Sequence, residues 1–331
     1  MAYGNRLTQW IYEHSPVLFQ NLFTTYWGWK VRRRRYGRYF VEYFRFLQEC
    51  QWYDEKELRE LQHEKLHKLI KYSYESVPYY RELFDKIKLK SSDIRTVEDL
   101  PKIPIFEKDI VRKRWKDLLS KAYPRNKSII YHTSGTTGKS IMVYVTRNCY
   151  EREYALRWMH YSWGGIKRGE RFATIAGHPV APISQTKPPF WRHNLAENQL
   201  IFSSQHISRD TLPHYIEALR RFQPAMIHGY PSSIYLIAHY LAENNISDIR
   251  PKGVFTSSET LLNFQRKIIE EAFGCKVFNY YGNTEMVAHA TECELGGMHV
   301  QLLHSMMEIT DEKGNPVGEG EEGIIIGTGL D

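Results

Sequence analysis

The chain has 331 residues, of which 42% are hydrophobic, 14% aromatic and 25% charged. This composition allows a large apolar core, in one big domain or two, and excludes an intrinsically disordered chain. The formal net charge of +7 suits nucleic acid, an anionic membrane surface or a small anionic ligand, and composition alone does not choose between them.

Residues 1–120 are predicted to be mainly helical and to form a region that packs on the rest of the chain. The apolar residues that recur there at helical spacing, among Glu, Lys and Gln, are Leu58, Leu61, Leu66, Leu69 and Ile70. Pro101 and Pro104 interrupt the pattern, so the chain is expected to pass through a linker into a second region, residues 121–331.

Aromatic and basic residues are concentrated near the start of the chain. Four consecutive arginines, Arg32 to Arg35, follow Trp27 and Trp29. Such a mixture can lie at an anionic bilayer surface, and peripheral membrane contact is one hypothesis. The alternative is the solvated basic face of a helix that packs on the protein body.

The cysteines predict neither a disulfide framework nor a zinc ribbon. Cys50, Cys149, Cys275 and Cys293 are widely spaced and form no CxxC pair. The N-terminus lacks the apolar core of a signal peptide, and no run reaches the roughly 18 apolar residues that cross a bilayer. We therefore expect a protein of the reducing cytoplasm without a membrane-spanning segment.

From residue 121 onwards, short apolar stretches alternate with longer amphipathic ones. Strands are predicted at 128–132, 141–146, 171–176, 225–228 and 253–256, and helices at 212–221, 232–243 and 261–273. This alternation with short connections predicts an α/β fold with mostly parallel strands flanked by helices. The final segment, from residue 300, is predicted to be a β-rich tail.

The segment between the first two of these strands is rich in small and hydroxyl-bearing residues. It comprises Thr133, Ser134, Gly135, Thr136, Thr137, Gly138 and Lys139. Small residues let the backbone approach phosphate oxygens, hydroxyl and amide groups donate to them, and the lysine adds positive charge. A Walker A loop would need glycine at Thr133 and a helix after Lys139, where a strand is predicted. A kinase or GTPase is therefore disfavoured, and an ordinary surface turn remains the alternative.

A second segment, from Phe278 to Glu285, also suits a nucleotide. Tyr281 offers a flat face on which a purine can stack, Asn279 can pair with the purine edge, and Gly282 permits a close turn. Glu285 can hold Mg²⁺, which neutralises charge on departing phosphates. The alternative is an aromatic strand end with an ordinary surface glutamate.

Two further segments follow predicted strands. One contains Ser257, Ser258 and Glu259, and the other contains His228, Gly229 and Tyr230. The second lies at a strand-to-helix junction, where open α/β sheets bind ligands. His228 can equally be a hydrogen-bonded histidine beneath the start of a helix.

Together these segments resemble the adenylate-forming superfamily of acyl-CoA synthetases. We call residues 133–139 the Gly/Thr loop, and this loop is similar to the signature loop of that superfamily. The segment from Phe278 to Glu285 is similar to the YGxTE motif of the superfamily, and the two motifs follow in the same order along the chain. Residues 76–81, 228–232 and 292–300 resemble segments of the phenylacetate–CoA ligase and CapK subgroup. The likeness therefore extends from about residue 55 to residue 331.

The resemblance implies an ATP-dependent ligase that joins a carboxylic acid to AMP and passes the acyl group to CoA or another acceptor. It places the triphosphate on the Gly/Thr loop and Mg²⁺ at Glu285, with Thr284 and Glu285 as catalytic residues. The nucleotide is expected along Ser257, Ser258, Glu259, Asn279, Tyr280, Tyr281 and Gly282, and the substrate at His228, Gly229 and Tyr230. The CapK likeness implies a role in capsular or surface polysaccharide assembly.

Members of this superfamily continue beyond the position of Asp331, with an aspartate that binds the ribose and a small domain that carries a catalytic lysine. The resemblance therefore implies that this chain alone is weakly active or inactive. The rival hypothesis is a non-catalytic nucleotide-binding or scaffold protein of the same fold. Nucleic-acid binding has no motif behind it and is not expected, and a homodimer is left open.

Two other patterns are weaker candidates for metal sites. His63, Glu64 and His67 match HExxH, but the helix predicted there is polar and the histidines lie off its apolar stripe, so a metalloprotease is disfavoured. Near the end of the chain, Cys293 and His299 offer only two ligands, which do not make a zinc site.

Overall fold

The computed structural model describes residues 6–133 and 140–330, and the chain forms two compact units. The first unit comprises Met1–Gly37, Leu156–Tyr281 and Thr291–Met298. The second comprises Arg38–Ala155, Gly282–Ala290 and His299–Asp331. The two units are interleaved along the chain. The predicted division into residues 1–120 and 121–331 stays a prediction.

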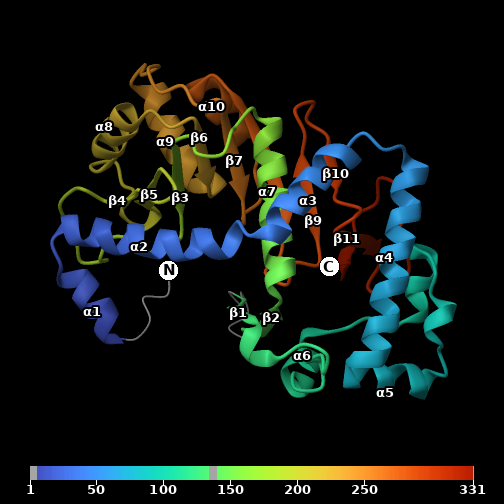
Figure 1. Ribbon diagram of the computed structural model, residues 1–331. Coiled ribbons are helices and arrows are strands. Elements are labelled where there is room, and N and C mark those ends of the chain that lie inside the picture. The colour runs from blue at the N-terminus through green and yellow to red at the C-terminus, as the bar shows by residue number, and fades with distance from the viewer. Residues whose placement is uncertain (1–5, 134–139, 331) are drawn as a thin grey trace. The chain divides into compact units, whose positions relative to one another are not determined.

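The main sheet has eight strands in the order β10-β9-β8-β7-β6-β3-β5-β4, and most of them lie in the first unit (Figure 1). The strands are β3 Phe172–Ala176, β4 Trp191–Asn194, β5 Gln199–Ser203, β6 Met226–Gly229, β7 Gly253–Ser257, β8 Lys276–Gly282, β9 His289–Glu292 and β10 Met298–Val300. Strands β5, β3, β6, β7 and β8 pair in parallel, and β4 pairs antiparallel with β5. The predicted α/β fold with mostly parallel strands is therefore confirmed.

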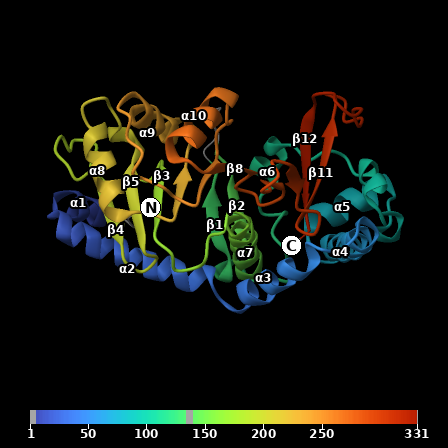
Figure 2. The same ribbon diagram turned by 90° about the horizontal axis from the view of Figure 1, so that it is seen from above.

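The parallel strands are apolar because helices cover both of their faces. Side chains alternate along a strand, so Val254 of β7 joins the core beneath α8 (Leu212–Phe222), α9 (Pro231–Glu243) and α10 (Asn263–Phe273). The next residue, Phe255, points to the other face and contacts Tyr161 of α7 (Arg147–Trp163), with ring centroids 4.9 Å apart. Figure 2 shows α8, α9 and α10 on one side of the sheet and α2 on the other.

The strand order reverses at β3, whose neighbours are β6 on one side and β5 on the other. Parallel pairing brings Ile175 of β3, Gly229 of β6, Thr256 of β7 and Asn279 of β8 into one row across the sheet. The row lies at the carboxyl ends of β3, β6 and β7. We call these four residues the edge row.

Helices α1 (Arg6–His14) and α2 (Val17–Arg35) begin the first unit, and α2 lies along the outer strand β4. The backbone nitrogen of His193 donates to Asn21 Oδ1 at 2.9 Å, and that of Leu195 donates to Thr25 Oγ1 at 3.1 Å. These polar side chains satisfy backbone groups of an edge strand, which would otherwise be open to pairing with another chain.

The second unit combines helices with two antiparallel hairpins. Its helices are α3 Arg38–Cys50, α4 Glu55–Ser76, α5 Pro78–Ile87 and α6 Lys108–Arg114, and its hairpins are β1 Ile129–His132 with β2 Met142–Val145 and β11 Ser305–Thr310 with β12 Ile324–Gly329. Short 3₁₀ helices in the two units span Ser91–Asp93, Val97–Lys102, Arg125–Lys127 and Ser204–His206. Leu66 and Ile70 of α4 pack with Phe84 of α5 and Met306 of β11 in one apolar core.

The observed elements agree with the stretches predicted from residue 121 onwards to within a few residues, and the β-rich tail is present as β11 and β12. The sequence did not indicate α7, in which charged residues interrupt the apolar pattern, or the short strands β4 and β5. None of the helices in the described part of the chain has both the length and the apolar content needed to cross a bilayer.

Replacing Gly229 by alanine is expected to destabilise the first unit by about 1–3 kcal/mol, because the added Cβ would lie 1.9 Å from the backbone oxygen of Ile175. Urea unfolding followed by circular dichroism measures the change. The matched control is Gly318→Ala, whose Cβ would meet no atom closer than 3.5 Å. Equal unfolding midpoints for the two variants would contradict the close pairing of β3 and β6.

Candidate functional site

The edge row brings together residues of three segments that the sequence singled out. Gly229 pairs with Thr256, and Thr256 pairs with Asn279. The hydroxyl of Thr256 donates to Asn279 Oδ1 at 3.1 Å, which fixes the orientation of the amide. An amide can make several hydrogen bonds, so this side chain can also pair with a purine edge.

A buried carboxylate holds the strand that carries Asn279. Glu292 is only 6% exposed, and its Oε2 accepts a hydrogen bond from the backbone nitrogen of Asn279 at 2.8 Å. The same oxygen accepts from Arg266 Nη2 at 2.8 Å, and Nη1 of this arginine donates to the carbonyl oxygen of Val277 at 2.9 Å. Because the charge of Glu292 is paired and hydrogen-bonded, its burial is tolerated and β8 is kept in place.

The segments after β6 and β7 are also joined. Glu259 Oε2 accepts from the backbone nitrogen of Ser232 at 3.2 Å, in the first turn of α9, where a carboxylate is favoured by the helix dipole. Ser258 adopts a left-handed backbone conformation with φ of 72°. Its hydroxyl lies 3.4 Å from that of Ser257, and Ser257 pairs with Tyr280 of β8. The predicted residues Ser257 to Glu259 therefore lie beside both other segments.

Positive charge surrounds His228, which is half-buried in β6. Burial, together with the nearby Arg157 and the smaller effects of His178 and Arg35, lowers the pKa of His228 to about 3. Burial also lowers the pKa of His178 to about 4, with Arg35 adding to the effect. Both imidazoles are therefore neutral near pH 7, while the arginines create a field that favours an anion.

The aromatic residues of β8 differ in exposure. The guanidinium of Arg157 lies 5.4 Å from the ring centroid of Tyr280, a cation–π contact that holds this half-buried ring. Tyr281 is 42% exposed, so its ring is accessible for stacking. Gly229 and Tyr230 lie at the turn into α9, whose first residue is Pro231.

In the second unit, hydrogen bonds close the base of the Gly/Thr loop between β1 and β2. Thr133 N donates to the Ile141 oxygen at 3.1 Å, and Ile141 N donates to Thr133 Oγ1 at 3.1 Å. Ser140 Oγ donates to the Thr133 oxygen at 2.6 Å. The strand β2 after the loop agrees with the rejection of a Walker A motif. The predicted residues Ser134, Gly135, Thr136, Thr137, Gly138 and Lys139 lie outside the described residues.

The predicted catalytic residues Thr284 and Glu285 follow β8 directly and are half-buried. Gly282 is the exposed last residue of that strand. Asn283 closes a turn after β8. Its Oδ1 accepts a hydrogen bond from the backbone nitrogen of Val287 at 3.0 Å, and its carbonyl oxygen accepts one from the backbone nitrogen of Met286. Thr133, Thr284 and Glu285 belong to the second unit and are described there by themselves.

A cavity of about 210 Å³ lies elsewhere in the first unit. Its lining includes Arg32, Arg168, Phe172 and Glu197. Phe172 is the first residue of β3, so the cavity is at the opposite end of this strand from the edge row. It is smaller than the roughly 300 Å³ of a typical ligand pocket, and the motif residues are the stronger candidate site.

The mostly parallel sheet with helices on both faces defines an open α/β protein. The sequence model of the AMP-binding enzymes matches residues 54–329, and the chain belongs to this family. The resemblance identified from the motifs is thereby confirmed.

The chain is 32% identical to protein CapK of Staphylococcus aureus over 312 residues, which are 93% of this chain and 67% of CapK. It is 28% identical to a phenylacetate-coenzyme A ligase of Thermus thermophilus over 283 residues, which are 83% of this chain and 62% of the ligase. The predicted subgroup therefore agrees with these relatives.

Among solved structures, a 2-hydroxyisobutyryl-CoA ligase in the postadenylation state superposes with a TM-score of 0.63 at 19% identity. The superposition covers 83% of this chain and 60% of that one, and it shows a shared fold. The chain spans about two thirds or less of the length of these three proteins.

Sequence reasoning missed three residues of the site. Glu292 was noted only as part of a similar segment, and its role as acceptor for Asn279 depends on strand pairing. Arg157 and His178 lie far from the motifs in sequence, although both act on His228. Because the sequence did not indicate α7, no local pattern around Arg157 pointed to this contact.

Acidification is expected to destabilise the protein through these histidines. The pKa of His228 is about 3 in the folded protein and about 6.5 in an unfolded chain, so below about pH 6.5 the unfolded state binds more protons. The free energy of unfolding should therefore fall as the pH decreases from about 7 towards 4. His228→Gln should show a smaller decrease in urea titrations. An identical pH dependence for the variant and the unmodified protein would contradict the buried neutral imidazole.

Proposed function

We propose that the intact protein activates a carboxylic acid with ATP to an acyl-AMP, with release of pyrophosphate, and transfers the acyl group to CoA or another acceptor. The observation that carries the proposal is the edge row, which joins the segments around Gly229, Thr256 and Asn279 at one edge of the sheet. In open α/β sheets, ligands bind at this edge where the strand order reverses.

In this proposal the adenine lies against β8. Asn279 pairs with the purine edge, and the exposed ring of Tyr281 stacks on its face. Tyr280 and Gly282 shape the strand end, and Ser257 to Glu259 run beside the nucleotide. The bond from Thr256 orients the Asn279 amide before the ligand arrives, which lowers the entropy cost of binding.

We assign the phosphates and Mg²⁺ to motif residues of the second unit on the basis of their residue types alone. Hydroxyl groups at Thr133 and Ser140 flank the Gly/Thr loop, and Thr284 and Glu285 add a hydroxyl and a carboxylate. Mg²⁺ prefers such oxygen ligands, and Glu285 would bind it directly. When bound, the ion neutralises charge on the phosphates as pyrophosphate leaves. Thr284 and the loop hydroxyls orient the phosphate oxygens.

The acid is proposed to bind near His228, Gly229 and Tyr230. The field of Arg157 and Arg35 favours a carboxylate there, while the neutral imidazole of His228 can share a hydrogen bond with it. Gly229 has no side chain because the backbone of β3 occupies that space. The reaction needs orientation of the acid towards the α-phosphate, which these groups supply.

The relatives suggest finer assignments. Their names favour a phenylacetate–CoA ligase or CapK type of enzyme. With the CapK likeness we propose a role in capsular or surface polysaccharide biosynthesis, and we propose the cytoplasm as the location. The alternative is a nucleotide-binding or scaffold protein without catalysis. Pyrophosphate exchange across a panel of aryl, acyl and amino acids separates the two, because a scaffold binds ATP but exchanges no pyrophosphate with any acid.

Asn279→Leu is expected to weaken ATP binding by about tenfold, because a leucine removes the hydrogen bonds to the purine edge and leaves the strand intact. Isothermal titration calorimetry with ATP and Mg²⁺ measures the affinity of the 331-residue chain. The control is Asn244→Leu, which changes an asparagine after the C-terminus of α9. Unchanged affinity for Asn279→Leu, or an equal loss in the control, contradicts the adenine assignment.

A second proposal concerns α2, whose polarity is inverted relative to a typical surface helix. Its buried side includes Gln20 and Thr24, which are 3% and 1% exposed. Its exposed large apolar residues are Leu18, Phe19, Leu22, Phe23, Tyr26, Trp27 and Trp29. They recur at helical spacing, and Arg32 to Arg35 follow them. This combination supports peripheral contact with an anionic membrane.

Vesicle co-sedimentation tests this membrane contact. Binding to vesicles that contain anionic phospholipid is expected, with weaker binding to zwitterionic vesicles, because the arginines are attracted to negative lipids. The double variant Leu18→Ser with Leu22→Ser should lose binding, while Leu295→Ser, a change at a 90% exposed leucine in the same unit, should retain it. A dimer in light scattering without vesicle binding would instead indicate that a second copy covers this face.

A further inference from the structure

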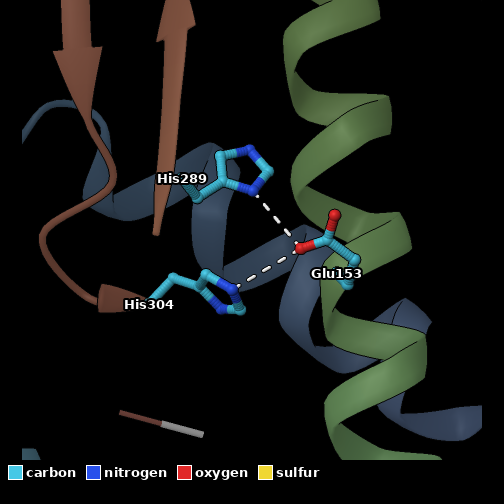
Figure 3. A group of neighbouring side chains, drawn as sticks. All are labelled: Glu153, His289 and His304. Atoms are coloured by element: carbon cyan, nitrogen blue, oxygen red, sulfur yellow. Dashed lines mark hydrogen bonds and ion pairs between the residues drawn. The ribbon is translucent and has the colours of Figure 1, made fainter. Parts of the chain in front are cut away.

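A cluster of three buried ionisable side chains lies in the second unit, outside the candidate nucleotide site. Glu153 comes from α7, His289 is the first residue of β9, and His304 directly precedes β11. Their exposed fractions are 1%, 0% and 1%. Figure 3 shows the two imidazoles pointing towards one carboxylate oxygen of Glu153.

The distances within this cluster match those between ligands of one metal ion. His289 Nδ1 lies 3.3 Å and His304 Nε2 lies 3.5 Å from Glu153 Oε2. One ligand atom of each residue lies within 4.8 Å of those of the other two. Tetrahedral Zn²⁺ has bonds of about 2.0–2.1 Å to nitrogen and oxygen, which places its ligand atoms about 3.3 Å apart. The two histidine rings are tilted by 80° and do not stack.

The donor atoms of the cluster also favour a transition metal. Glu153 faces two imidazoles, so two nitrogens and one oxygen are available as ligands. This donor set suits Zn²⁺ better than Mg²⁺ or Ca²⁺, which prefer oxygen ligands alone.

We propose that Glu153, His289 and His304 bind one Zn²⁺ ion, or a similar divalent transition metal, with water completing a tetrahedral site. The ion links α7 to β9 and to the turn before β11, two segments that come more than a hundred residues after α7 in the sequence. His289 is four residues after Glu285, so the ion also anchors the end of the segment that carries Thr284 and Glu285. Its role is structural, and it is separate from the Mg²⁺ proposed to bind Glu285.

The other histidine pair considered from the sequence serves as a comparison. His63 and His67 lie on α4, where His67 is exposed and His63 is half-buried. They do not belong to the cluster of three ligands found among the described residues. Variants at His63 and His67 therefore remove two histidines of the same unit while leaving the proposed site intact.

The test is the metal content of the 331-residue chain, produced with zinc and dialysed without ATP or any acid. Elemental analysis is expected to find about one equivalent of Zn²⁺ per chain. Replacement by Co²⁺ should give the visible absorption bands of a tetrahedral centre. His304→Ala and Glu153→Gln should each lose the metal, while the double variant His63→Asn with His67→Asn should keep it.

A chelator provides a second measurement that does not depend on the folding of any variant. It should lower the melting temperature of the unmodified chain, because a ligand bound only by the folded state stabilises it. An unmodified chain that retains no metal, gives no Co²⁺ spectrum and melts at the same temperature with chelator would overturn the proposal. The cluster would then consist only of the contacts between Glu153 and the two imidazoles. Neither outcome depends on adenylation.

Discussion

The candidate site depends on the in-register parallel pairing of β3, β6, β7 and β8. This pairing aligns Ile175, Gly229, Thr256 and Asn279, so segments more than twenty residues apart in the chain meet at one edge of the sheet. Glycine is required at position 229, since the backbone of β3 lies where a Cβ would be. A shift of register by one residue would turn Asn279 to the other face of the sheet, because side chains alternate along a strand. The geometry of the proposed purine site is therefore a consequence of backbone hydrogen bonding.

Around this edge, polar groups that would be costly to bury are satisfied within the first unit. Glu292 binds both the backbone of Asn279 and the guanidinium of Arg266, and Glu259 accepts from the first turn of α9. His228 avoids the cost of a buried charge by remaining neutral, as its lowered pKa shows. Such preorganisation lets the site present fixed hydrogen-bond donors and acceptors to a ligand without rearrangement.

The sequence predicted the α/β fold because hydrophobic periodicity and strand–helix alternation are local properties, and β6, α9, β7 and α10 appear close to their predicted bounds. It predicted the motif residues because Asn279, Tyr281 and Glu285 lie within one short segment. It could not predict that Glu292 supports Asn279, that Arg157 and His178 act on His228, or that Glu153 meets His289 and His304. These contacts join residues far apart in the chain, and they depend on tertiary packing that a local pattern does not contain.

Photoaffinity labelling with 8-azido-ATP tests the central claim most directly, because the reactive group is attached to the adenine itself. The account predicts that the label is found on the peptide that carries Asn279 to Tyr281 or on the adjoining Ser257 to Glu259 segment, and that excess ATP prevents the labelling. A label confined to other peptides, such as those around Arg32 or Arg168, would contradict the placement of the nucleotide at the carboxyl edge of the sheet.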